Sequence, residues 1–138
     1  MIFLMTPLSF ASANEIDSLL AGYRNDGAAE FSAVRGKLIW TTPRNIDGEQ
    51  RACSSCHTAD PVASGKHVKT GKPIEPIAAS ANPERFTDAA KTEKWFRRNC
   101  KWTLGRECTA QEKGDLLLRL RLPCIHPFRP QPSPYQSQ

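Results

Sequence analysis

Cys53-Ser54-Ser55-Cys56-His57 is the most informative segment of this 138-residue sequence. Two cysteines separated by two residues and followed at once by a histidine are typical of covalent, c-type haem attachment. Two thiols at this spacing can add to the two vinyl groups of one haem, and the next residue then brings an imidazole to the iron. We therefore predict one haem c, attached through Cys53 and Cys56 and ligated by His57.

A cysteine pair at this spacing also occurs in redox dithiols and in zinc sites. A redox dithiol of the thioredoxin type needs a βαβ context, which the sequence does not indicate. A zinc site needs a second ligand pair at a spacing of roughly two to four residues. Cys100 and Cys108 have seven residues between them, so they match a zinc site poorly. Haem attachment is the better interpretation.

The two ends of the chain differ in composition from its middle. Residues 1–13 are uncharged and mostly apolar and end in Ala11-Ser12-Ala13, which is typical of a signal-peptidase site. We expect a signal peptide there, with export to the periplasm. Residues 123–138 contain five of the eleven prolines and are predicted to be a disordered tail. Residues 14–122 then form one cytochrome c domain.

Apolar spacing predicts an all-α fold with a long loop in its middle. The expected helices cover residues 15–24, 28–40, 89–99 and 109–122. Thr87 is the expected cap of the third helix, and Thr109 and Glu112 have capping-box spacing at the start of the fourth. In the second helix we expect these side chains to point inward: Phe31, Val34, Leu38 and Ile39. Residues 43–87 lack an apolar period, so we expect them to wrap the haem.

The second axial ligand of the iron separates the candidate functions. Electron-transfer cytochromes c use a methionine there, which raises the reduction potential. The methionines of this sequence, Met1 and Met5, both lie in the predicted signal peptide. The residues alone leave these alternatives open: His67, His126, Asn99, a lysine or an empty site.

Three cysteines remain after haem attachment. Cys100 and Cys108 enclose a short loop between two predicted helices, and a disulfide is the expected state of such a pair in an exported protein. Closing this loop would stabilise the fold by ~2–3 kcal/mol. An added redox role stays open. Cys124, in the predicted tail, is left free or forms an intermolecular bond.

The formal net charge of +5, before the haem propionates are counted, predicts a modestly basic surface. Such a surface favours an acidic redox partner, such as another cytochrome, or an anionic membrane. The basic residues are spread along the chain and export removes the usual nucleic acid targets, so we expect no nucleic acid partner. We expect the protein to be a monomer.

Beyond the attachment motif, the sequence resembles the family of the sphaeroides haem protein and cytochrome c″. The resemblance covers the chain from residue 15 to residue 122. It is carried by these segments: Ala52-Cys53-Ser54-Ser55-Cys56-His57, Thr70-Gly71-Lys72-Pro73-Ile74-Glu75-Pro76, Arg85-Phe86-Thr87-Asp88, Glu93-Lys94-Trp95, Asn99-Cys100, Leu104-Gly105-Arg106-Glu107-Cys108-Thr109 and Glu112-Lys113.

This resemblance implies a class I cytochrome c fold with one haem and a disulfide between Cys100 and Cys108. It also implies that the residue before the first disulfide cysteine is the sixth iron ligand, which here is Asn99. In the family this ligand leaves on reduction, which implies electron transfer coupled to binding of O₂ or NO, with oxidase or NO-detoxifying turnover left open. The alternatives are a simple electron carrier with a closed six-coordinate haem and a haem-based sensor without turnover.

Overall fold

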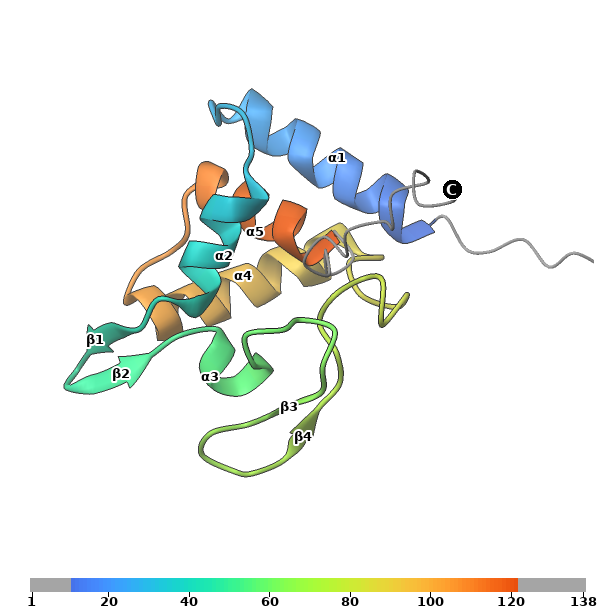
Figure 1. Ribbon diagram of the computed structural model, residues 1–138. Coiled ribbons are helices and arrows are strands. Elements are labelled where there is room, and N and C mark those ends of the chain that lie inside the picture. The colour runs from blue at the N-terminus through green and yellow to red at the C-terminus, as the bar shows by residue number, and fades with distance from the viewer. Residues whose placement is uncertain (1–10, 122–138) are drawn as a thin grey trace, which may run out of the picture.

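The computed structural model describes residues 11–121, whose helices pack around a central C-terminal helix (Figure 1). The helices are α1 (Ala11–Asn25), α2 (Ala33–Thr41), α3 (Ser54–His57), α4 (Ala89–Leu104) and α5 (Ala110–Arg121). Two antiparallel hairpins connect them: β1 (Arg44–Ile46) with β2 (Glu49–Arg51), and β3 (Gly65–Lys66) with β4 (Pro73–Ile74). Within residues 11–121 we find no helix that could cross a membrane.

The core lies where α1, α2 and α4 meet α5. Its largest apolar members are Ile16, Leu19, Leu20 and Tyr23 of α1, Phe31, Trp40 of α2, Phe96 of α4 and Leu116, Leu117 and Leu120 of α5. Each such side chain contributes about 1.5–3 kcal/mol when it is fully buried. This core holds the four long helices together and leaves α3 and the loop of residues 58–88 to one side of α4 (Figure 1).

The crossing of α2 and α5 depends on a glycine and a buried carboxylate. A Cβ at Gly36 would lie 2.1 Å from the backbone oxygen of Asp115, so only glycine allows this approach. The Asp115 side chain is 2% exposed and accepts hydrogen bonds from the Arg35 guanidinium and the Ser32 backbone N–H. A buried carboxylate with these partners fixes the angle at which the two helices meet.

The second helix differs from its prediction. It begins at Ala33 instead of residue 28, because the Ser32 hydroxyl caps it by accepting a hydrogen bond from the Arg35 N–H. Phe31 is buried as predicted, but from the turn before the helix. The inward orientation predicted for Val34 and Leu38 is wrong, since they are 72% and 59% exposed. The buried residues of α2 are Gly36 and Trp40, one turn apart.

The other predicted boundaries are mostly close to the observed ones. The third helix is capped by Asp88 instead of Thr87, and it continues past Asn99 to Leu104, where Gly105 ends it at a φ of 71°. Residues 43–87 contain α3 and the two hairpins instead of loop alone. Helix α1 begins at Ala11, inside the predicted signal peptide. The rest of that peptide and the predicted tail lie outside the described residues.

Candidate functional site

A cavity of about 880 Å³ lies between α4, α3 and the long loop. Its volume is in the upper part of the range of small-molecule pockets, roughly 300–1,000 Å³. Aromatic side chains contribute much of its wall: Trp40, Phe86, Trp95, Phe96 and Trp102. The predicted attachment residues Cys53, Cys56 and His57 line the same cavity, and so do Asn99 and His67. The sequence candidates within the described residues therefore converge on one site.

Helix α3 places the two cysteines and the histidine together. It is a single turn that follows Cys53, and the His57 N–H donates to the Cys53 carbonyl at 3.1 Å. Both cysteines are free thiols and are not bonded to each other. Burial raises the pKa of the Cys53 thiol, and a hydrogen bond with Thr103 of α4 opposes that shift. Because neither sulfur is bonded to another residue, both thiols are available for addition to the vinyl groups of a haem.

His57 is held beside Trp40. The two rings lie 5.4 Å apart, and the Trp40 indole N–H donates to the carbonyl of Thr58, whose φ of 64° ends α3. The Nδ1 atom of His57 is buried and has no hydrogen-bond partner among the described residues. Burial lowers the pKa of His57, with a smaller contribution from the positive charge of Arg85. Both effects favour the neutral imidazole, which is the form that binds a metal.

Asn99 and His67 differ in what their side chains already bind. No described residue forms a hydrogen bond with the carboxamide of Asn99, an exposed residue of α4 that lines the cavity. The Nδ1 atom of His67 accepts from the backbone N–H groups of Lys69 and Thr70, at 3.3 and 3.2 Å. The Nδ1 atom of His67 is therefore engaged in hydrogen bonds within the turn between β3 and β4. His126 lies outside the described residues.

The predicted disulfide between Cys100 and Cys108 is present, and both residues line the cavity. Because these sulfurs are bonded to each other, they are not available as thiolate ligands for zinc. Within residues 11–121 no group of three or more His, Cys, Asp or Glu side chains is arranged as a metal site.

The residues present fit a covalently bound haem. Two unbridged thiols face the cavity, a neutral imidazole follows them, and aromatic side chains surround the space that a flat macrocycle needs.

Trp40, Thr103 and Gly65 contribute to this arrangement but were not singled out from the sequence. Trp40 was placed only as the end of a helix, and no local pattern marks Thr103 or Gly65.

Comparison with known proteins identifies the family. Residues 26–120 match a family described as a domain of unknown function, DUF1924. Over 100 residues the sequence is 44% identical to the cytochrome c-type protein SHP of Cereibacter sphaeroides, covering 72% of this chain and 77% of SHP. The chain belongs to the SHP family. Cytochrome c″ of Methylophilus methylotrophus is 42% identical over 90 residues, which are 64% of this chain and 62% of cytochrome c″.

Solved structures of the same two proteins have the same fold. Oxidised SHP, described as an oxygen-binding cytochrome c, has a TM-score of 0.71 at 42% identity, covering 76% of this chain and 94% of SHP. Oxidised cytochrome c″ has a TM-score of 0.70 at 33% identity, covering 78% of this chain and 93% of that protein. The predicted helical cytochrome fold is confirmed. As a member of the SHP family, this chain is a c-type cytochrome that carries one covalent haem c.

Proposed function

We propose that this protein is a periplasmic cytochrome that couples electron transfer to binding of a diatomic ligand, O₂ or NO, at an iron site that opens on reduction. His57 is the permanent axial ligand and Asn99 is the ligand that leaves. The observation that carries the proposal is that Asn99 lines the haem cavity while no described residue forms a hydrogen bond with its carboxamide. Residues 11–121 contain no methionine that could take its place.

The haem supplies one-electron redox chemistry and, where an axial position is open, an iron that binds diatomic molecules. The Asn99 carboxamide oxygen is a hard and weak donor, which binds Fe(III) better than Fe(II). Asn99 is therefore expected to leave the iron when an electron arrives. His57 ends α3 with its N–H bonded to the Cys53 carbonyl, and its lowered pKa favours the neutral imidazole, so it would hold the iron in both oxidation states.

Two further observations support parts of the proposal. SHP, which shares 42% of its aligned residues with this chain in the structural comparison, is described as an oxygen-binding cytochrome c. The Cys100–Cys108 disulfide suits an oxidising compartment, which supports the periplasmic location. The electron donor that we propose is another cytochrome with an acidic or membrane-associated surface.

The test compares the wild-type holoprotein with Asn99→His and Asn99→Ala. The wild type should bind CO rapidly when reduced. Because an imidazole holds ferrous iron more tightly than an amide does, Asn99→His should be low-spin when ferric and bind CO at least tenfold more slowly. Asn99→Ala should be high-spin when ferric and bind CO at least as fast as the wild type. Optical and electron paramagnetic resonance spectra report the spin states, and flash photolysis reports the CO rates.

Two results would contradict the proposal. If the reduced wild type fails to bind CO, the haem stays six-coordinate and the protein is a simple electron carrier. If both variants keep the wild-type ferric spectrum, Asn99 is not an iron ligand. In that case His67→Ala becomes the informative variant, because His67 lines the same cavity and its Nε2 atom is not engaged in the hairpin turn.

A further inference from the structure

The haem cavity has two chemically different ends along α4. At one end the Cys53 thiol forms a hydrogen bond with Thr103, near the C-terminus of the helix. Trp95 lines the cavity eight positions earlier, which is about 12 Å along the axis at a rise of 1.5 Å per residue. A haem carries its two vinyl groups on one side of the macrocycle and its two propionates toward the other. A thioether at Cys53 would therefore leave the propionates toward the Trp95 end of the cavity.

Arg85 stands at that second end without a charged partner. It lines the cavity, is half-buried, and its guanidinium lies 5.6 Å from the centre of the Trp95 ring. Its Nε donates to the carbonyl of Pro76 at 3.1 Å and its Nη2 to the carbonyl of Glu75 at 3.2 Å. These two bonds leave Nη1 free. No carboxylate among residues 11–121 forms an ion pair with it.

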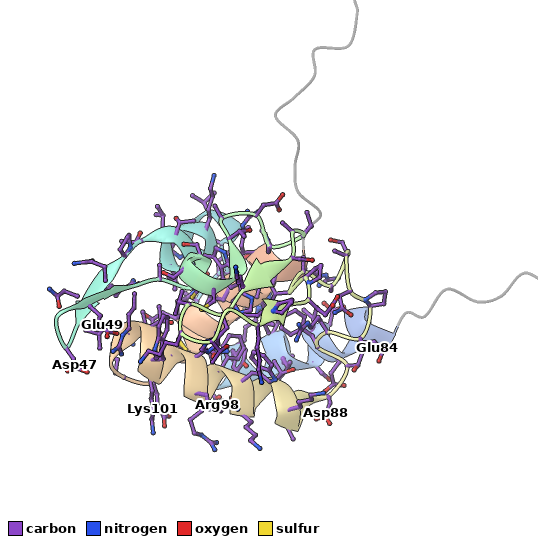
Figure 2. The ribbon with its side chains drawn as sticks, turned by 90° about the horizontal axis from the view of Figure 1, so that it is seen from below. Asp47, Glu49, Glu84, Asp88, Arg98 and Lys101 are labelled. Atoms are coloured by element: carbon purple, nitrogen blue, oxygen red, sulfur yellow. A yellow bond between two sulfur atoms is a disulfide. The ribbon has the colours of Figure 1, made fainter. Side chains whose placement is uncertain are left out.

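The acidic residues that line the same cavity form no ion pair with Arg85. Glu75, Glu84 and Asp88 also line the cavity, and Figure 2 shows Glu84 and Asp88 at the same end of α4. Asp88 is committed to the helix, because its Oδ1 accepts from the N–H of Lys91 at 2.9 Å. The two carbonyls hold the Arg85 guanidinium in the cavity wall and leave one of its edges without a partner. A guanidinium in this position can bind a carboxylate.

We propose that Arg85 is the counter-charge of a haem propionate, with Trp95 covering the outer face of the guanidinium. Arg85 is thus a positioning residue for the cofactor. Its charge also stabilises the reduced haem, since reduction adds an electron near a fixed positive charge. This proposal rests on the covalent haem alone, so it stands or fails independently of the role given to Asn99.

The test uses holoproteins in which the propionate carboxyl carbons of the haem carry ¹³C. In reduced-minus-oxidised infrared spectra, the labelled carboxylate bands should shift in Arg85→Gln relative to the wild type. The midpoint potential should fall, so that the ratio of reduced to oxidised protein at a fixed potential drops about tenfold, which is 59 mV for one electron. Arg97→Gln is the matched control, since Arg97 is an exposed arginine of α4 that does not line the cavity.

Arg85→Lys separates the charge from the geometry of the guanidinium. A lysine keeps the positive charge but not the planar pair of donors, so the potential should recover most of the loss while the labelled bands still differ from the wild type. If Arg85→Gln does not fold, the labelled carboxylate bands of Arg85→Lys still test the proposal. The proposal is wrong if the labelled bands of both variants match the wild type, whatever the potential does. It is also wrong if Arg97→Gln shifts those bands equally.

Discussion

Gly65 shows how one residue outside the attachment motif controls its position. Strand β3 passes so close to α3 that a Cβ at Gly65 would lie 2.1 Å from the carbonyl oxygen of Cys56 and 2.9 Å from the Cα of His57. Both neighbouring atoms belong to the backbone, so neither can turn aside as a flexible side chain does. The space for the haem-binding turn therefore depends on the absence of a side chain at Gly65.

We expect Gly65→Ala to lower the free energy of unfolding by ~1–3 kcal/mol, because a methyl group forced against backbone must push β3 away from α3. Displacement of His57 should also change the haem absorption spectrum. Denaturant unfolding and the visible spectrum measure the two effects. Gly22→Ala is the control, since a Cβ there meets nothing within 4 Å and alanine stabilises a helix by up to about 1 kcal/mol. Equal stability of the two variants would contradict the prediction.

The residues of the site differ in how much of the sequence is needed to predict their role. Cys53, Cys56 and His57 were predicted from five consecutive letters, because haem attachment is a property of one turn. Gly65 and Arg85 act through contacts with residues eight to ten positions away, and no short sequence motif reports those contacts. The choice of Asn99 over His67 as iron ligand came from family resemblance alone and stays a prediction.

At the scale of elements, the start of α5 was predicted from local sequence and is confirmed. The Thr109 hydroxyl accepts from the N–H of Glu112 at 3.1 Å, and the Thr109 N–H donates to the Glu112 carboxylate at 2.9 Å. Arg106 adds two hydrogen bonds of 2.8 Å to the same carboxylate. A capping box involves four consecutive positions, so the sequence contains all of its information.

This cap predicts a dependence of stability on pH. The hydrogen bond from Arg106, and then those from Thr109, hold the pKa of Glu112 below its usual value. A carboxyl with a lowered folded-state pKa stabilises the fold above its unfolded pKa of about 4.3, and this stabilisation is lost as the pH falls toward the folded value. Glu112→Gln should therefore lower the free energy of unfolding by ~1 kcal/mol at pH 7 and by less at pH 3.

Urea unfolding at pH 7, 5 and 3 measures this difference. Glu107→Gln is the matched control, because Glu107 is 60% exposed and its ion pair with Lys101 spans 3.6 Å, a geometry that contributes little. A constant difference between Glu112→Gln and the wild type at all three pH values would rule out the carboxylate as the origin of the effect. An equal loss of unfolding free energy in Glu107→Gln would show that the effect does not depend on the position of the carboxylate in the cap.

The elements that were predicted less well depend on tertiary packing. The phase of α2 is set by Gly36 against α5 and by the Ser32–Asp115 hydrogen bond, so Val34 and Leu38 face outward although their spacing is that of a buried face. The β1–β2 hairpin, in contrast, has a local sequence signal in its Asp-Gly pair. Asp47 and Gly48 both have positive φ, as a two-residue hairpin turn requires.

At the scale of the whole molecule, the charges of α4 are unevenly placed around the haem cavity. Lys91, Lys94, Arg98 and Lys101 recur every three or four positions along one exposed side of the helix, which we call the α4 cationic stripe. Three of them line the cavity: Lys91, Arg98 and Lys101. Figure 2 shows Arg98 and Lys101 projecting from α4 away from the body of the fold. Redox reagents that approach the cavity over this side of α4 therefore meet positive charge.

The α4 cationic stripe predicts faster reaction with anionic redox reagents than with cationic ones. Oxidation of the reduced protein by ferricyanide should slow by about two- to fivefold in Arg98→Glu at low ionic strength, because attraction to the cavity edge is weakened. Oxidation by the cation tris(phenanthroline)cobalt(III) should speed up instead. Both differences should vanish at high salt, where charges are screened over about 3 Å. Stopped-flow absorbance at several ionic strengths measures the rates.

Lys37→Glu is the control that separates local from overall charge. Lys37 is an exposed residue of α2 that does not line the cavity, and its substitution changes the net charge by the same amount as Arg98→Glu. If electrons enter at the α4 cationic stripe, Lys37→Glu should leave both rates nearly unchanged. Equal effects of the two variants would mean that the reagents respond to the net charge of the molecule, and that an acidic partner has no reason to prefer α4.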